Sequence, residues 1–419
     1  MTENESYNPI TLEYVHETLK NWLYLEASDL EYVDIVLAAA LDRDIPGDPL
    51  WLEVIGPSGA MKSELLRAVS TYHKCYTLDT MTTNTFVSGS PSKDGQPKGI
   101  LQDLDGKIVV LKDFGVILAM PDKERYEIFA QFRQVYDGTF EKATGNMRKK
   151  VTVHATIGLI LGCTPNIDHH QQLQTKLGER FLKVRQSPNG DAVTKRAVEN
   201  LGKEAEMRRD ISMTIGAFFG WLNHPTNTNG LSKIPEPTKK QTETLRKLAI
   251  YVSKMRAWVY TKVNRQGELY DMEVPEPEIA GRVVKQLKKL VQALAIVRGH
   301  DTITEEEMNA ARRVARQTAI PKRLLLIEAL MNNPMEEVPI REVVNQTGML
   351  FNSLRIAMFE ARGLGILDCK EEVERGPPVF SEREREYVQP KIGTSYFMTL
   401  NADFKPFVEA TITIEEVEA

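Results

Sequence analysis

The spacing of hydrophobic and polar residues divides the chain into an α/β part and helical parts. From Trp51 onward, short apolar runs bounded by polar or glycine turns alternate with helical patterns. This alternation is typical of a parallel sheet with helices on both faces. We therefore expect an α/β core over residues 49–190. Its predicted strands are residues 52–55, 75–78, 108–111 and 156–161.

Helical periodicity dominates the segments that flank this core. Residues 11–41 carry apolar positions at helical spacing, which predicts two helices within a lead of residues 1–48. Past Gln186 the helical pattern continues to about residue 320, and it is clearest over residues 282–298, where one apolar stripe is set off from lysines. Residues 191–320 are therefore expected to form an all-helical lid domain.

A third unit is predicted over residues 321–419. Its first part carries the pattern of short helices, with Gly348 at a tight turn between the second and the third. A polar, charged ribbon flanked by β-forming residues follows over residues 379–400. This order is typical of a winged helix-turn-helix. The predicted helices are residues 324–331, 340–347 and 350–361.

Composition narrows the class of protein. A chain of 419 residues, 42% of them hydrophobic, can bury a large core. Cys75, Cys163 and Cys369 are scattered, which argues against a disulfide framework or a zinc cluster and favours a reducing, cytoplasmic location. We expect neither a secretory segment nor a membrane span. Because the net charge is −5, any surface that binds nucleic acid must be local.

The most informative chemical motif follows the first predicted strand, in Trp51-Leu-Glu-Val-Ile-Gly-Pro-Ser-Gly-Ala-Met-Lys-Ser63. A strand, a glycine-containing turn and a helix that begins at Lys-Ser form the P-loop pattern, in which backbone N–H groups cradle a triphosphate. Lys62 would reach the outer phosphates and Ser63 would ligate Mg²⁺. A strict P-loop has glycine where this chain has Met61, so an ordinary strand-turn-helix is the alternative interpretation. The predicted nucleotide-binding residues are Gly56, Pro57, Ser58, Gly59, Ala60, Met61, Lys62 and Ser63.

A carboxylate that completes the Mg²⁺ site is predicted at the end of another strand. Gly106-Lys-Ile-Val-Val-Leu-Lys-Asp113 is an apolar strand that ends in an acid, so Asp113 is the candidate Walker B residue. A cap of the following turn is the alternative role. Phe114 stands where such ATPases usually have the glutamate that orients water, so no hydrolytic base is assigned. Asp79, after the neighbouring strand, is either a further carboxylate or a turn residue.

Positive charge is concentrated between the Walker B strand and the next strand. Gly145-Asn146 lies between β-forming arms within residues 137–154, which predicts a hairpin. Lys142, Arg148, Lys149 and Lys150 lie at or near its tip. This cluster is either a solvated charged turn or a surface that contacts DNA.

The order of these motifs resembles AAA+ ATPases. The chain has G-P-S-G-A-M-K-S, V-V-L-K-D, a basic hairpin, L-I-L-G-C-T-P-N, L-G-E-R-F-L and then E-I-A-G-R-V-V-K-Q-L-K-K-L over residues 50–320. It is most similar to the branch with a hairpin before the first sensor, which includes minichromosome maintenance helicases and MoxR-type ATPases. The overall plan also resembles ATPases of phages and mobile genetic elements.

The resemblance implies roles for further residues. Thr164 matches the polar sensor 1 residue, with Asn166 as the alternative. Arg180 matches the arginine finger that a subunit offers to its neighbour's nucleotide. Arg282 matches sensor 2, which touches the γ-phosphate; an exposed arginine at a helix start is the alternative, although positive charge there opposes the helix dipole.

The resemblance also implies a function. We expect an ATP- and Mg²⁺-dependent hexameric motor on single- or double-stranded DNA, similar to a helicase or translocase in replication or mobile-element maintenance. Basic hairpin residues from several subunits would line a central pore. We expect no counterpart of the DNA-binding and zinc-bearing domain of the replicative helicases, so the resemblance does not imply processive unwinding. Two alternatives stay open: a MoxR-like protein remodeller, and an ATP-gated DNA initiator or loader with little turnover, which Phe114 would suit.

Overall fold

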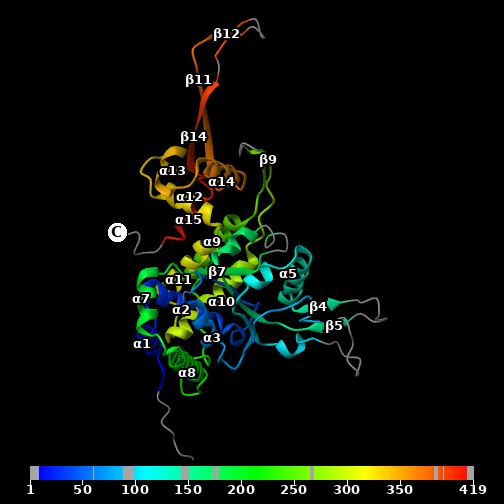
Figure 1. Cartoon of the computed structure of the whole chain (residues 1–419), viewed down its shortest axis with the longest axis vertical. Helices are drawn as coiled ribbons and strands as arrows, with labels where there is room; N and C mark the ends of the chain where they lie inside the picture. The colour runs from blue at the N-terminus through cyan, green and yellow to red at the C-terminus, as the bar shows by residue number, and fades with distance from the viewer. Residues whose placement is uncertain are drawn as a thin grey trace, which may run out of the picture. The chain divides into compact units, whose positions relative to one another are not determined.

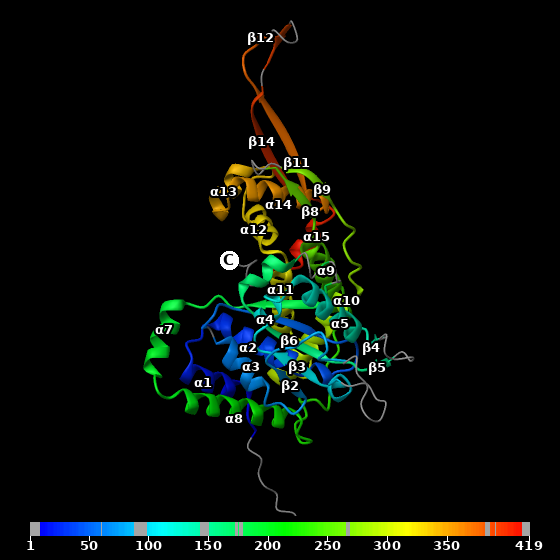
Figure 2. The ribbon, with the colours of Figure 1, turned by 45° about the vertical axis from the view of Figure 1, so that its right-hand side comes forward.

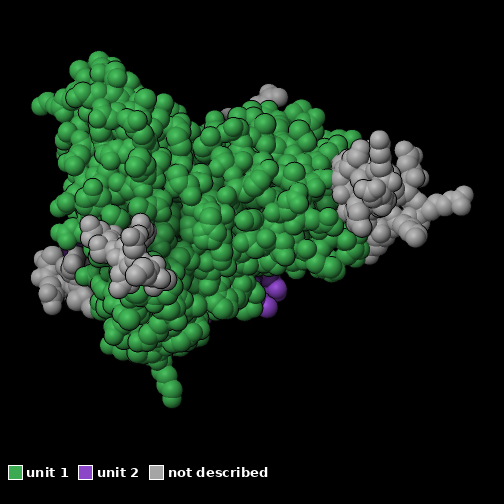
Figure 3. Space-filling model, turned by 90° about the horizontal axis from the view of Figure 1, so that it is seen from below, with its two compact units in different colours: residues 1–249, 280–318 green, residues 250–279, 319–419 purple. Residues whose placement is uncertain are grey.

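The computed structural model describes residues 9–59, 61–87, 99–142, 151–171, 175, 179–264, 269–381, 386–389 and 391–412. The chain divides into two compact units (Figure 3). Unit 1 consists of residues 1–249 and 280–318, and unit 2 of residues 250–279 and 319–419. The finer division into lead, core, lid and winged helix stays a prediction.

Unit 1 is built on a parallel sheet. In the described part of the chain the sheet has five strands in the order β2-β3-β6-β1-β7, which confirms the α/β class and is compatible with a P-loop core. The expected strand over residues 156–161 instead begins at Gly158, because Thr156 is bound to a loop: its N–H donates to Asp105 Oδ1 at 2.9 Å, and its carbonyl accepts from Gly106 at 3.0 Å. The strands are β1 (Trp51–Ile55), β2 (Cys75–Leu78), β3 (Ile108–Leu111), β6 (Gly158–Cys163) and β7 (Phe181–Arg185).

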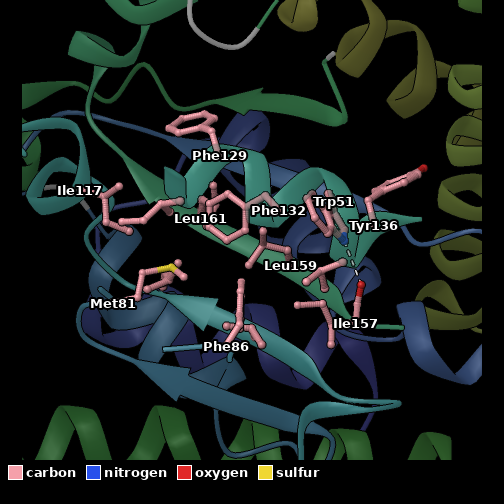
Figure 4. Close-up of a cluster of buried hydrophobic side chains, with 14 of the residues drawn as sticks. Trp51, Met81, Phe86, Ile117, Phe129, Phe132, Tyr136, Ile157, Leu159 and Leu161 are labelled. Carbon is pink, nitrogen blue, oxygen red and sulfur yellow. Dashed lines mark hydrogen bonds between the residues drawn. The ribbon is translucent and has the colours of Figure 1, made fainter. Parts of the chain in front are cut away.

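Helices cover both faces of this sheet. Phe132 and Tyr136 of α5 pack beside Trp51 of β1 in a buried hydrophobic cluster (Figure 4). Alternate residues of β1 point to the other face, where α2 packs. The two expected N-terminal helices are confirmed as α1 and α2, and α8 lies along α1 and α3 (Figure 2). The helices of unit 1 are α1 (Leu12–Trp22), α2 (Ala27–Ala39), α3 (Lys62–Val69), α4 (Gly115–Leu118), α5 (Asp122–Tyr136), α7 (Gly190–Glu199), α8 (Glu204–Leu222), α10 (Gly281–Arg298) and α11 (Glu305–Thr318), with α9 (Lys239–Arg256) divided between the units; short 3₁₀ turns are η1 (Asp42–Asp44), η2 (Gln102–Leu104) and η3 (Pro165–His170).

The arms of the predicted basic hairpin are present. Strands β4 (Thr139–Lys142) and β5 (Val151–His154) pair antiparallel, with Thr139 opposite His154. The tip, including Gly145-Asn146 and the basic residues Arg148, Lys149 and Lys150, lies outside the described residues, as does Ala60 of the P-loop segment. The contact of these basic residues with DNA therefore stays a prediction.

The expectation of an all-helical stretch over residues 191–320 is wrong at one place. Strands β8 (Tyr260–Val263) and β9 (Leu269–Glu273) form an antiparallel hairpin in unit 2. Aromatic and β-branched residues dominate β8, and such side chains favour a half-buried pleated surface over a helix. Lys262 and Asp271, which are opposite each other in the register, form an ion pair at 2.7 Å.

Unit 2 confirms the three predicted short helices. They are α12 (Pro321–Met331), α13 (Ile340–Thr347) and α14 (Phe351–Gly363), and Gly348 ends α13 with a φ of 67°. The ribbon begins earlier than predicted, at Leu367, and forms the long antiparallel pair seen in Figure 1. The strands are β10 (Val338–Pro339), β11 (Leu367–Arg375), β12 (Val379–Ser381), β13 (Glu386–Val388) and β14 (Lys391–Leu400), followed by α15 (Lys405–Glu409).

Candidate nucleotide-binding site

The backbone of the predicted P-loop turns at the carboxyl end of β1. Gly59 has a φ of +82°, a conformation that favours glycine. Met61 adopts φ −59° and ψ −17°, the ordinary right-handed helical conformation, and its side chain is buried. The departure from glycine at this position therefore causes no backbone strain, because an L-residue adopts these angles freely.

Lys62 is held at the ends of two adjacent strands. Its side chain is 7% exposed, and Nζ donates to the carbonyl of Gly56 at 3.2 Å and to that of Cys163 at 2.8 Å. Burial lowers the pKa of Lys62 below the ordinary 10.5, and the nearby Cys163 and Asp113 oppose this shift. The ammonium is thus a buried cation whose two hydrogen-bond acceptors are neutral carbonyls, an arrangement that an anionic phosphate can displace.

Asp113 comes directly after β3 and its neighbour Lys112, at the same edge of the sheet. Its Oδ1 accepts the N–H of Gly115 at 2.9 Å, so it caps the next turn as the alternative interpretation held. Its side chain is exposed at the edge of the sheet that also carries Lys62, and its negative charge counters the lowering of the pKa of that lysine. The ammonium group of Lys112 forms an ion pair with the exposed carboxylate of Asp79 at 2.8 Å. Asp79 is therefore already paired with a charge next to Asp113.

A glycine in the neighbouring strand allows the Asp113 loop to come this close. A Cβ at Gly162 would lie 2.3 Å from the carbonyl oxygen of Lys112, which real Cβ atoms do not tolerate. The N–H of Phe114 donates to the carbonyl of Gly162 at 2.9 Å and fixes the loop against β6. The phenyl ring of Phe114 is fully buried, 5.6 Å from the ring of Phe129. Phe114 is therefore a core residue that sets the position of Asp113 and offers no base.

Thr164 lies at the carboxyl end of β6, next to Cys163. It is the N-cap residue of η3, its side chain is partly exposed, and its carbonyl accepts the N–H of Ile167 at 3.1 Å. Asn166 is exposed. Because the carboxyl ends of parallel strands share one edge, the fold brings Lys62, Asp113 and Thr164 together there.

Arg180 and Arg282 lie together, but at the opposite end of the sheet. Both guanidinium groups lie over the ring of Tyr136, at 5.3 and 5.4 Å from its centroid. Tyr136 packs against Trp51, at the start of β1, with the ring centroids 5.0 Å apart (Figure 4). At about 3.3 Å per residue, the length of β1 separates the arginines from the P-loop by roughly 15 Å. The structure therefore does not bring Arg282 to the P-loop segment of its own chain, where the resemblance to sensor 2 would place it.

Arg180 is not an exposed finger. Its side chain is 6% exposed and pairs with Asp137 at 3.3 Å, and burial together with the charge of Arg282 lowers its pKa. Arg282 donates to the carbonyl of Glu179 at 3.1 Å. The Asp137 side chain, however, is 57% exposed, so the cluster reaches the surface of unit 1 at this point.

The residues that hold the guanidinium groups of Arg180 and Arg282 could not be predicted from the sequence. Tyr136 and Asp137 belong to no motif, and their proximity to Arg180 and Arg282 arises only through the fold.

Comparison with known proteins identifies no relative. Among known families no family model matches the chain, and no curated protein matches its sequence. None of the helices searched in the described residues has the length and apolarity that a membrane crossing requires.

Proposed function

We propose that the chain is a ring-forming ATPase of the AAA+ type that binds and hydrolyses Mg-ATP. The observation that carries the proposal is the gathering of Lys62, Asp113 and Thr164 at one edge of a parallel sheet, beside a turn with the P-loop sequence. Crevices at the carboxyl ends of the strands are where open α/β sheets bind ligands.

The side chains at this edge fit a magnesium triphosphate. Lys62 supplies a buried cation for the outer phosphates, and the N-terminus of α3 supplies backbone N–H groups for anionic oxygens. Ser63 and Asp113 are both exposed and offer the hydroxyl and carboxylate oxygens that Mg²⁺ prefers. Bound Mg²⁺ would neutralise charge that develops on the transferring phosphoryl group.

The arginine pair supports assembly. Because Arg180 and Arg282 lie far from their own P-loop, they can serve a nucleotide only if it is bound to a neighbouring chain. Two guanidinium groups at such a contact would stabilise the transition state of phosphoryl transfer. We propose a ring, and a hexamer in keeping with the resemblance to AAA+ motors.

The test is ATP hydrolysis by the purified chain with Mg²⁺. We expect turnover that is abolished in Lys62→Ala and kept in Lys123→Ala, which removes an exposed lysine of α5 instead. No nucleotide binding by the unaltered chain would refute the proposal. Particle images with a non-hydrolysable ATP analogue would show whether the chains form a ring.

We propose DNA as the substrate of this motor. The support is the β4–β5 hairpin, whose arms are present and whose sequence carries Arg148, Lys149 and Lys150 in an otherwise acidic chain. We expect DNA to raise the ATPase rate, and reversal of these three charges to remove that increment. ATPase activity that is indifferent to DNA would favour the protein remodeller.

The winged helix-turn-helix that we propose for unit 2 is a poor DNA reader. Helix α14 carries only Arg355 and Arg362 as basic residues, and β11 carries more acidic than basic side chains. We expect residues 321–419 to bind DNA weakly and without sequence preference. The test is the salt dependence of DNA binding, compared between the unaltered full-length chain and a full-length chain substituted within this unit.

One observation favours a second candidate, the ATP-gated initiator or loader. Phe114 is buried in the core, so the position after Asp113 cannot orient water. This candidate predicts tight binding of ATP, nucleotide-dependent assembly on DNA and negligible turnover. A single-turnover measurement separates it from the motor.

A further inference from the structure

Tyr136 links the two arginines to the sheet. It is the last residue of α5, and its ring packs against that of Trp51, with the centroids 5.0 Å apart. The ring of Phe181, the first residue of β7, also packs against Trp51, at 5.2 Å. The Tyr136 side chain is more than nine-tenths buried, yet its hydroxyl has no hydrogen-bond partner among the described residues. Figure 4 shows this hydroxyl pointing away from the hydrophobic cluster.

The two arginines come from different elements. Arg180 precedes β7, whereas Arg282 is near the start of α10, and the two elements are connected here by the bond from Gln286 Nε2 to the carbonyl of Arg180 at 2.6 Å. Two like charges repel at short range, and the charge of Arg282 lowers the pKa of Arg180. Other side chains must therefore hold the two guanidinium groups close together.

The ring of Tyr136 and the carboxylate of Asp137 meet this need. An aromatic face attracts a cation, and both guanidinium carbons lie within about 6 Å of the ring centroid, the range in which this attraction operates. Asp137 neutralises one of the two charges through its contact with Arg180. Both groups belong to consecutive residues at the end of one helix, so they move as a unit with α5.

We propose that Tyr136 is a positioning residue for catalysis between subunits: its ring holds Arg180 and Arg282 as a pair, aimed at the nucleotide of a neighbouring chain. This inference rests on the proposed ATPase function and deepens it. Tyr136 itself does not touch the nucleotide; it acts through the two arginines. The cluster reaches the surface of unit 1 at Asp137, and a neighbour's phosphate would approach there by displacing the Asp137 carboxylate from Arg180.

Two substitutions distinguish the role of the aromatic ring of Tyr136 from the roles of its volume and its hydroxyl group. Tyr136→Phe keeps the ring and should restore turnover relative to Tyr136→Leu, which keeps apolar volume but loses the aromatic face. We expect Tyr136→Leu to lower kcat at least tenfold or so, with little change in KM, because nucleotide is bound at the other end of the sheet. Tyr126→Leu, a half-exposed tyrosine of the same helix, is the matched control.

Mixed assemblies decide whether the defect acts between chains. Lys62→Ala lacks the P-loop lysine but keeps the arginine pair, and Tyr136→Leu has the reverse defect. If the pair serves a neighbour, mixing the two variants creates interfaces in which both parts are intact. We expect the mixture to hydrolyse ATP faster than the sum of the separate variants.

Each outcome bears on a different statement. If Tyr136→Leu hydrolyses ATP normally, or if mixing restores nothing while Tyr136→Leu still binds a fluorescent ATP analogue, the inference is overturned and the ATPase function stands. If Tyr136→Leu cannot bind the analogue, its fold is damaged and Tyr136→Met takes its place; turnover of Tyr136→Met equal to that of Tyr136→Phe would then overturn the role of the ring. If the unaltered chain neither binds nor hydrolyses ATP, the proposed function fails first.

Discussion

The buried ammonium of Lys62 leads to a specific expectation for Lys62→Met. The substitution removes two hydrogen bonds, to the carbonyls of Gly56 and Cys163. An acceptor left unsatisfied costs about 1–3 kcal/mol, although the Cys163 carbonyl still accepts the N–H of Gly56 at 3.1 Å. The substitution also removes the cost of burying a charge, which the lowered pKa of Lys62 reveals. These effects oppose each other, so we expect the free energy of unfolding without nucleotide to change by only about 1 kcal/mol.

The response to nucleotide should change far more. A ligand at one hundred times its Kd stabilises the folded state by about 2.7 kcal/mol, which raises the Tm of a chain of this size by roughly 3 °C. We expect that rise in the unaltered chain with Mg²⁺ and a non-hydrolysable ATP analogue, and none in Lys62→Met, by thermal unfolding at matched concentrations. The reasoning is refuted if Lys62→Met keeps the full rise, or if it unfolds without nucleotide at a much lower temperature.

Three further outcomes follow from the same structure. Asp113→Asn should still bind ATP but lose the increase in affinity that Mg²⁺ provides, as titration with and without the metal would show; equal metal dependence would exclude Asp113 as a ligand. Glu53 and Lys183 form a buried pair at 3.5 Å, 0% and 2% exposed, so Glu53→Gln should cost about 3 kcal/mol of unfolding free energy in denaturant, and a double change to apolar residues should recover most of it. A neutral Glu53→Gln would mean that Glu53 carries no charge, in keeping with the rise that burial causes in its pKa. Because the pKa of Lys62 is lowered, ATP affinity should fall with rising pH before 10.5, whereas Lys62→Arg, which stays charged, should show no such fall.

The parts of the fold that sequence could predict are those encoded locally. Apolar runs of four to six residues specify β1, β3 and β6, and the sequence of the turn with Gly59 and Lys62 specifies the candidate phosphate-binding site. The hairpin of β8 and β9 was not predicted, because its short β-forming runs lie between long helical patterns. The late start of β6 depends on hydrogen bonds between Thr156 and a distant loop, which no local pattern contains.

The candidate site divides in the same way. Lys62 and Asp113 could be found from their positions after strands, because the topology of a parallel sheet brings such positions together. The arginine cluster could not, since Tyr136, Arg180 and Arg282 are far apart in the chain and meet only through packing. The buried state of Phe114 likewise depends on the aromatic side chains of α5.

The separation of Lys62 and the arginine pair along the sheet has a consequence for symmetry. A contact that joins the carboxyl edge of one sheet to the amino edge of the next is head-to-tail, so it does not satisfy itself in a two-fold dimer. A linear string of chains would always leave one P-loop without arginines at one terminus and one unused pair at the other. Only closure gives every chain a complete site, so the proposed hydrolysis per chain should grow with the fraction of P-loops that face a neighbour's arginines and reach its full value at the stoichiometry at which the circle closes.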